Sequence, residues 1–196
     1  MVELAHARTI VALNGSPRLT SRTGAVVDRI ASAIATRIPA AIRSIHAANA
    51  APQLLAALTR DRVPPPGETL LRAIETADIL VVGTPVYRGS YSGALKHIFD
   101  LVDRDALAGR TVVLAATGGT PLHGLVGEHQ LRPLFGFFRA LTVPTFVFAT
   151  EDEVIGGVLS KPLKDRVERA ADEAVALFGA SQALARPADL RQAVGA

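Results

Sequence analysis

The chain has 196 residues, and 49% of them are hydrophobic. Its formal net charge is +3, and it contains no cysteine. The lack of cysteine excludes disulfides, thiolate nucleophiles, iron–sulfur clusters and cysteine-ligated zinc, so redox chemistry would require a bound organic cofactor. The sequence also lacks the apolar run of a membrane span, the apolar core of a signal peptide and the basic, aromatic-rich stripe of a nucleic-acid-binding surface. We therefore expect a cytoplasmic protein that binds neither membrane nor nucleic acid.

Strand and helix patterns alternate along the chain. In order, the predicted elements are strand 9–14, helix 21–37, strand 40–45, helical segments 52–59 and 67–76, strand 79–83, helix 92–102, strand 110–116, helix 128–141, strand 143–148 and helix 161–178. The strands are short and almost continuously apolar, which is typical of a parallel sheet covered by helices on both faces. The Ala-rich residues 181–196 are expected to form a partly disordered tail.

The loop after the first predicted strand, residues 14–23, reads NGSPRLTSRT and leads directly into a helix. It contains neither the Gly-Lys-Ser/Thr ending of a P-loop nor the three spaced glycines of a dinucleotide fingerprint. The hydroxyls of Ser16, Ser21 and Thr23, the side chain of Arg18 and the positive end of the next helix are instead suited to an anion. The loop therefore predicts a site for a phosphate monoester.

Two further loops are expected at the same edge, because ligands of parallel sheets bind beyond the carboxyl ends of the strands. The loop after strand 79–83 contains Pro85 and the two tyrosines of the chain, Tyr87 and Tyr91. The loop after strand 110–116 contains Gly118 and Gly119, which allow a ligand to approach the backbone closely. Together the loops predict a ledge for a flat ring next to the phosphate site.

These segments resemble the NAD(P)H-dependent FMN reductases of flavodoxin-like fold, the reducing partners of two-component flavin monooxygenases. The matching residues are 15–18, 21–23, 83–96, 117–119 and 128–134, and the resemblance spans about residues 8–180. It implies an α/β three-layer sandwich with a five-stranded parallel sheet of order 2-1-3-4-5. It also implies one FMN-binding domain, residues 1–180, followed by the tail.

The resemblance implies that hydride passes directly from the nicotinamide of NADPH or NADH to the flavin, with no catalytic side chain and no metal. It implies FMN-binding residues in three groups: Ser16, Arg18, Ser21 and Thr23 at the phosphate, Pro85, Val86, Tyr87 and Gly89 along the isoalloxazine ring, and Thr117, Gly118 and Gly119 at its other edge. Arg22 and Arg88, like Arg18, are candidates for the phosphates of the nicotinamide dinucleotide or are solvated surface arginines.

The methanesulfonate-type reductases resemble this chain most, because they carry a histidine at the position of His129. The alkanesulfonate-type reductases carry a tyrosine there, on a π-bulge at a tetramer interface that is linked to flavin release. Pro133 lies inside the predicted helix 128–141 and predicts a kink or bulge there. The resemblance implies a homodimer or homotetramer, with FMNH2 delivered to a flavin-dependent monooxygenase of sulfonate, and hence sulfur, metabolism.

Other functions remain open at this point. A quinone, azo-dye or metal reductase of the same fold would retain its FMN instead of releasing it. A flavodoxin-like electron carrier would be strongly acidic and would carry a Thr-x-Thr-Gly-x-Thr loop, neither of which applies to this chain. A small phosphatase would need a nucleophile such as cysteine. The residues do not decide between NADH and NADPH.

Overall fold

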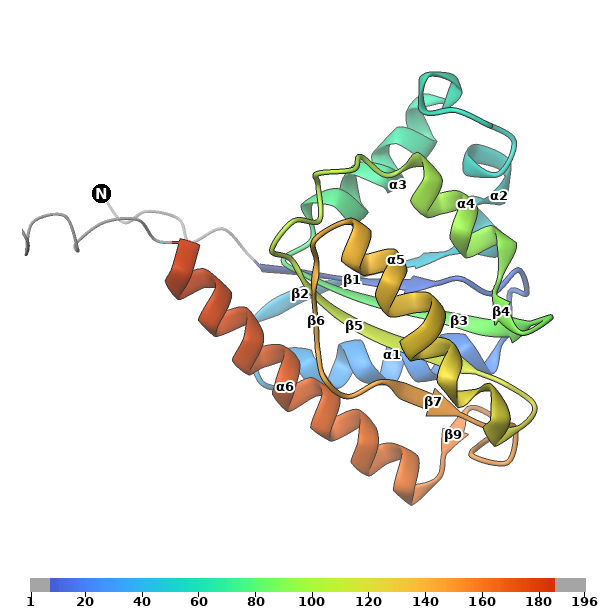
Figure 1. Ribbon diagram of the computed structural model, residues 1–196, viewed down its shortest axis with the longest axis vertical. Coiled ribbons are helices and arrows are strands. Elements are labelled where there is room, and N and C mark those ends of the chain that lie inside the picture. Colours follow the sequence, from blue (N-terminus) through green and yellow to red (C-terminus); the bar gives the residue numbers. More distant parts are fainter. Residues whose placement is uncertain (1–7, 186–196) are drawn as a thin grey trace, which may run out of the picture.

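The computed structural model describes residues 8–185, which form one layered α/β unit (Figure 1). Its strands are β1 Arg8–Asn14, β2 Ala40–His46, β3 Ile79–Tyr87, β4 Ser90–Tyr91, β5 Thr111–Thr117, β6 Leu141–Thr142, β7 Val147–Ala149, β8 Val154–Ile155 and β9 Val158–Leu159. Its helices are α1 Arg22–Ala35, α2 Ala47–Leu54, η1 Arg60–Arg62, α3 Pro65–Thr76, α4 Gly93–Leu101, η2 Pro121–Leu125, η3 Gly127–Leu131, α5 Arg132–Phe137 and α6 Lys161–Ala185.

The central sheet has the order β2-β1-β3-β5-β6, with all of these neighbours parallel. This corresponds to the predicted 2-1-3-4-5 order, but within residues 8–185 the sheet has seven strands instead of the predicted five. One extra strand is β4, which adds a short antiparallel hairpin to β3. The fifth position differs from the predicted strand 143–148 and is shared by β6 and β7, which both pair with β5. Pro144 lies between them and has no N–H to donate to the ladder, which explains the interruption.

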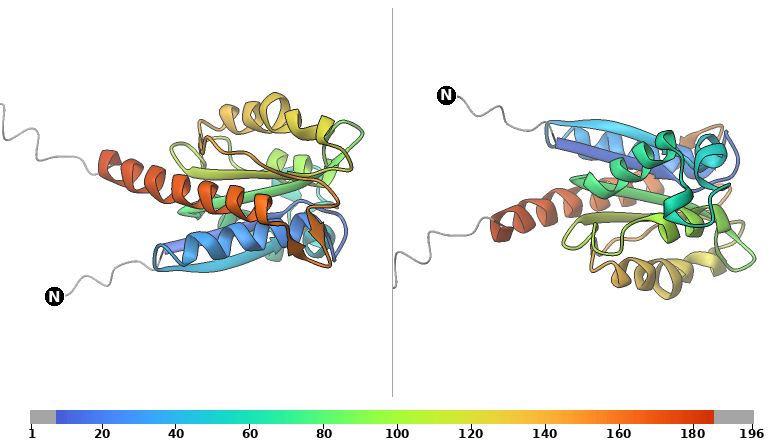
Figure 2. Two further views of the ribbon diagram at one scale, coloured as in Figure 1. Left: turned by 90° about the horizontal axis from the view of Figure 1, so that it is seen from below. Right: turned by 90° about the horizontal axis from the view of Figure 1, so that it is seen from above.

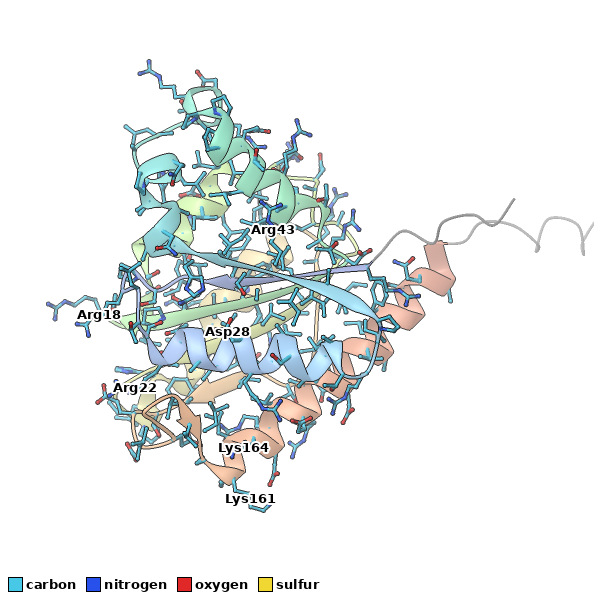
Figure 3. The ribbon with its side chains drawn as sticks, turned by 180° about the vertical axis from the view of Figure 1, so that it is seen from behind. Arg18, Arg22, Asp28, Arg43, Lys161 and Lys164 are labelled. Carbon is cyan, nitrogen blue, oxygen red and sulfur yellow. The ribbon has the colours of Figure 1, made fainter. Side chains whose placement is uncertain are left out.

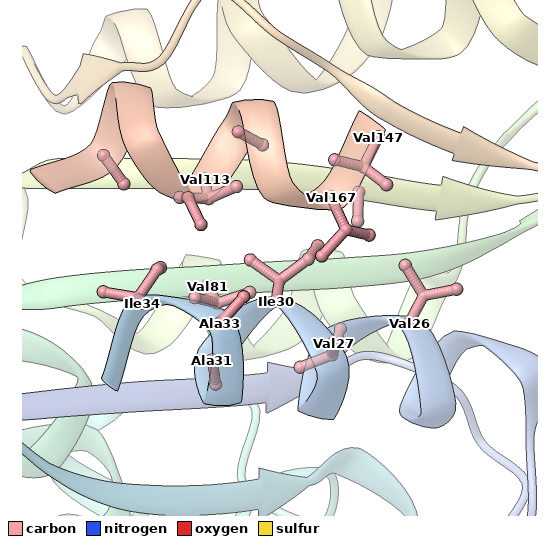
Figure 4. Close-up of a cluster of buried hydrophobic side chains, with 14 of the residues drawn as sticks. Val26, Val27, Ile30, Ala31, Ala33, Ile34, Val81, Val113, Val147 and Val167 are labelled. Carbon is pink, nitrogen blue, oxygen red and sulfur yellow. The ribbon is translucent and has the colours of Figure 1, made fainter. Parts of the chain in front are cut away.

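The three inner strands are buried along almost their whole length, as their continuous apolar sequences predict. One side of the sheet packs against α1 and α6, where Val26, Ile30 and Ile34 of α1 meet Val81 of β3 and Val167 of α6 (Figure 4). The other side packs against α2, α3, α4 and α5. Views at right angles show the three layers (Figure 2). The predicted three-layer sandwich is confirmed.

At one end of the sheet, β2 has a single neighbouring strand among residues 8–185, and residues 41–44 of β2 are exposed. The helix after β2 differs from the predicted segment 52–59. It starts at Ala47, directly after the strand, because Ala47, Ala50 and Leu54 bury one face at helical spacing. Pro52 lies inside this short helix instead of starting it.

The predicted helix 128–141 is in fact a π-helical turn, η3, followed by the short helix α5. Pro133 explains the wide turn, because it lacks the N–H that an α-helix would direct at the carbonyl of His129. The expected bulge near Pro133 is therefore confirmed. Gly127 starts the turn, and a Cβ there would lie 2.4 Å from the Phe146 ring, so the turn needs a glycine.

The last helix is longer than predicted. It extends to Ala185, so the first residues of the expected disordered tail, 181–185, are helical, and residues 186–196 lie outside the described part of the chain. None of the helices between Arg8 and Ala185 combines the length and the hydrophobicity needed to cross a lipid bilayer.

Candidate functional site

A cleft of about 910 Å³ lies at the carboxyl ends of β1, β3 and β5. It collects most of the predicted site residues: Ser16, Arg18, Ser21, Arg22, Thr23, Pro85, Val86, Tyr87, Thr117, Gly118 and Gly119. Three loops far apart in the sequence therefore meet at the sheet edge where they were expected. A cleft of this size is typical of small-molecule and cofactor sites.

The loop after β1, residues 15–21, is the expected phosphate loop. It is held in place by hydrogen bonds to β3 and to residues next to it in the chain. The N–H of Gly15 donates to the carbonyl of Gly83 on β3, at 2.7 Å. The N–H of Ser16 donates to Asn14 Oδ1 at 3.0 Å, and the N–H of Arg18 donates to Ser16 Oγ at 3.1 Å. The hydroxyl of Ser16 thus accepts one bond within the loop and keeps its proton for a ligand.

Ser21 caps the N-terminus of α1. Its Oγ accepts hydrogen bonds from the N–H of Gly24 at 3.1 Å and from Asn14 Nδ2 at 3.2 Å. Both acceptor positions are then used, so the hydroxyl proton of Ser21 is directed elsewhere. The N–H groups of Arg22 and Thr23 belong to the first turn of α1 and have no partner within the helix. The cleft therefore offers several donors at the positive end of a helix.

Thr23 lines the cleft, as expected, and its hydroxyl also has a partner within the fold. Its Oγ1 lies 2.7 Å from Thr117 Oγ1, and both side chains are buried. The hydroxyl of Thr23 therefore joins α1 to the end of β5.

The ledge consists of Pro85, Val86 and Tyr87, which all line the cleft. They are the last three residues of β3, which is longer than the predicted strand 79–83. Arg88 and Gly89 were expected beside them, but the structure does not bring them into the cleft. They form the two-residue turn between β3 and β4, with φ of 53° and 79°, a left-handed geometry for which glycine is favoured. The physical reason for Arg-Gly at this point is thus the hairpin itself.

Ser92 connects the ledge to the phosphate loop. Its N–H donates to Thr84 Oγ1 at 2.9 Å, and its hydroxyl donates to the carbonyl of Gly15 at 2.6 Å. The same oxygen caps α4 by accepting from the N–H of Leu95. On the far side of the hairpin, Ser90 Oγ donates to Gln130 Oε1 in the π-helical turn, at 2.7 Å.

The third loop places two glycines in different surroundings. Gly118 lies against His123 and Phe148, since a Cβ there would be 3.1 Å from each side chain. His123 Nδ1 is buried and has no hydrogen-bond partner among the described residues. Gly119 has no atom within 4 Å of the position of a Cβ, and it lines the cleft. A side chain at Gly119 would therefore project into space that the described residues leave open.

Sequence reasoning missed further lining residues: Leu19, Thr20, Gly24, Ala25, Asp28, His46, Glu151, Val154, Ile155, Gly156 and Gly157. His46 ends β2, and its Nδ1 lies 3.3 Å from Asn14 Nδ2. Glu151 follows β7 and forms an ion pair with Arg22, at 3.0 Å. His46 and Glu151 lie at the ends of the second and fifth strand positions, so applying the carboxyl-end rule to every strand would have found these two.

The site combines a basic, donor-rich corner with a ledge and an open glycine, an arrangement that can hold a phosphorylated planar ring. Among residues 8–185, no group of three or more His, Asp or Glu side chains is placed to hold a metal ion. Fold and site together define a flavodoxin-like protein with a cleft that can accommodate a phosphorylated planar ligand.

Comparisons with known proteins agree with this class. The sequence pattern of the family described as "NADPH-dependent FMN reductase" matches residues 8–153. The chain is 46% identical over 171 residues to the NADH-dependent FMN reductase SfnF of Pseudomonas fluorescens, which covers 87% of this chain and 91% of that protein. It is 44% identical over 171 residues to an FMN reductase (NADPH) of Pseudomonas aeruginosa, covering 87% and 92% of the two chains.

Solved structures give the same picture. An oxidoreductase from Corynebacterium diphtheriae superposes with a TM-score of 0.78 at 33% identity, covering 90% of this chain and 99% of the other. The apo form of the NADH:FMN oxidoreductase EMOB also gives a TM-score of 0.78, at 27% identity, covering 89% and 90%. The chain belongs to the NADPH-dependent FMN reductase family. The family, the fold and the oxidoreductase class expected from the sequence are thereby confirmed.

Proposed function

We propose that this protein uses NADH or NADPH to reduce FMN and delivers FMNH2 to a partner flavin-dependent monooxygenase. The observation that carries the proposal is that one cleft is lined both by the donor-rich loop after β1 and by the ledge of Pro85, Val86 and Tyr87. When bound, FMN supplies the hydride-accepting ring on which the reduction depends. The protein's own residues bind FMN and the nicotinamide donor and orient them toward each other.

The groups around the cleft fit FMN. The free hydroxyl protons of Ser16 and Ser21 and the first-turn N–H groups of α1 would hold the phosphate, with Arg18 and Arg22 supplying positive charge. The ring would lie against Pro85, Val86 and Tyr87, with Thr117, Gly118 and Gly119 at its other edge. Both nicotinamide donors belong to the proposal, because similar proteins include NADH-dependent and NADPH-dependent reductases.

The resemblance to methanesulfonate-type reductases supports a sulfonate-type monooxygenase as the recipient of FMNH2. We also propose a homodimer or homotetramer, with α4 and the η3–α5 segment as interface candidates. Phe137 on α5 supports this choice, because 66% of this large apolar side chain is exposed in the single chain. The proposed location is the cytoplasm, where NADH and NADPH are available.

The test is to mix the purified protein with each nucleotide, with and without FMN, and to follow the loss of nicotinamide absorbance. We expect oxidation that rises with added free FMN. Oxidation of neither nucleotide in the presence of FMN would exclude the proposed activity. FMN that stays bound through purification, together with ping-pong kinetics on a quinone or azo dye, would favour a flavin-retaining reductase instead.

A further inference from the structure

We propose that Glu151 lowers the affinity of the cleft for the flavin phosphate and so makes FMN a released substrate instead of a resident cofactor. This inference rests on the proposed function and names a residue that sets the strength of FMN binding.

The geometry places an acid inside an anion site. Arg22 Nη1 lies 3.0 Å from Glu151 Oε1, with 47% and 57% of the two side chains exposed. Arg22 is the first residue of α1, and Glu151 lies two residues after the end of β7. Both line the cleft, and Figure 3 shows Arg22 at the same edge of the molecule as Arg18. The carboxylate therefore neutralises one of the arginines nearest to the helix N-terminus.

Two physical effects then oppose phosphate binding. A phosphate must compete with Glu151 for the Arg22 guanidinium, and it must approach the negative charge of Glu151 itself. Exposed charge pairs are weak, so the phosphate can still bind, but each effect lowers its affinity. Neither effect acts on the isoalloxazine ring, which carries no comparable charge. The structure thus separates the affinity for the phosphate from the affinity for the ring.

The side-chain contacts that organise the turn after β7 do not include Glu151. Its neighbour Glu153 organises the turn: Glu153 Oε2 accepts from the N–H of Thr150 at 3.1 Å, and Glu153 Oε1 lies 3.6 Å from Arg166 Nη1. Glu151 contributes to this turn through its backbone carbonyl, which accepts from the N–H of Val154. Among the described residues, Arg22 is the only ion-pair partner of Glu151. A carboxylate at this position is therefore better explained by the cleft than by stability.

The experiment measures flavin binding to the full chain by quenching of flavin fluorescence, for FMN and for riboflavin, which lacks the phosphate. Glu151→Gln should bind FMN about threefold or more tightly than the wild type, with riboflavin affinity unchanged. Release of FMNH2 should slow by a similar factor. Asp152→Asn is the matched control, since it removes an equal charge from the next residue, which does not line the cleft. It should change neither affinity.

An equal change for FMN and riboflavin, or FMN binding that is unchanged or weaker in Glu151→Gln, would overturn the inference. Glu151→Ala, checked by thermal unfolding, repeats the test if the glutamine variant folds poorly. The two proposals fail differently. A wild type that oxidises neither nucleotide with FMN contradicts the proposed function, whereas an active reductase without a phosphate-specific effect of Glu151 contradicts only this inference.

Discussion

The hydroxyl oxygens of Thr23 and Thr117 lie 2.7 Å apart and join the first turn of α1 to the carboxyl end of β5. The bond passes beside Gly83 of β3, where a Cβ would lie 3.1 Å from Thr23 Cγ2. Two loops of the cleft are therefore held together by a buried bond over a strand that carries no side chain at that point. The bond links two sides of the cleft in which we propose that the flavin binds.

The first prediction compares two threonines of β5. Thr117→Val should lower the free energy of unfolding by about 1–3 kcal/mol, because it leaves the buried hydroxyl of Thr23 without its partner. Thr111 is also buried, but its hydroxyl has no hydrogen-bond partner among the described residues. Thr111→Val should therefore be neutral or stabilising by about 1 kcal/mol. Urea unfolding of both variants measures the two changes in the free energy of unfolding. A lower free energy of unfolding for both variants would contradict the different hydrogen bonding of the two threonines.

The second prediction concerns the close approach of α1 to the sheet. A Cβ at Gly83 would lie 2.3 Å from Val27 Cγ2, so Gly83→Ala should destabilise the protein by about 1–3 kcal/mol through overpacking. Gly136 lies in α5 with no atom within 4 Å of a Cβ position. Gly136→Ala should therefore stabilise by about 0.5–1 kcal/mol. Thermal unfolding tests the pair, and a tolerated Gly83→Ala would mean that α1 moves readily.

The third prediction separates binding from stability in the third loop. Gly119→Ala adds a methyl group to open cleft space, so its melting temperature should stay unchanged while FMN affinity falls about tenfold. Gly118→Ala presses against His123 and Phe148 and should lower the melting temperature. Unchanged flavin affinity in Gly119→Ala would mean that the ring lies elsewhere. Calorimetry and flavin titration on the same samples give both readouts.

The fourth prediction is a pH effect at a site remote from the cleft. Arg60 donates two hydrogen bonds of 2.8 Å to Glu68, and this bidentate pair holds the pKa of Glu68 below its usual value of 4.5. A carboxyl group with a lowered pKa in the folded state stabilises the protein above its unfolded pKa. That contribution is lost as the pH falls through the folded pKa.

Glu68→Gln should therefore be less stable than the wild type at neutral pH, and the difference should shrink as the pH falls below about 4.5. Urea unfolding at several pH values measures this. Asp61→Asn, at an exposed residue of the neighbouring turn η1, is the control and should show no comparable gap. A gap for Glu68→Gln that widens in acid would contradict the pairing.

The sequence predicted the parts of the fold that depend on long, regular patterns of apolar residues. The apolar runs of β1, β3 and β5 identified the sheet, and the loops after them identified the cleft, because parallel strands end at one edge. The extent of η3 and α5 was not predictable in this way, since a π-helical turn has no periodic signature of its own. Pro133 was the one local signal, and it gave the right position.

Parts of the site could not be predicted for two reasons. Arg88 and Gly89 look like ligand residues in a loop, and only the paired backbone of β3 and β4 shows that they form a turn. Glu151 follows the end of the predicted strand 143–148, but nothing in the sequence shows that its carboxylate meets a cation of the first loop. Its importance comes from the ion pair with Arg22, which brings together residues far apart in the chain.

The exposed edge strand β2 has a consequence for self-association. An unpaired strand offers free N–H and C=O groups on which another molecule can build an intermolecular sheet. Arg43 of this strand is exposed (Figure 3). Pro39 immediately precedes the strand and has no N–H to contribute to a sheet. Within residues 8–185 nothing pairs with this border of the sheet, and two molecules that joined there edge to edge would bring their Arg43 charges together, which disfavours fibril growth.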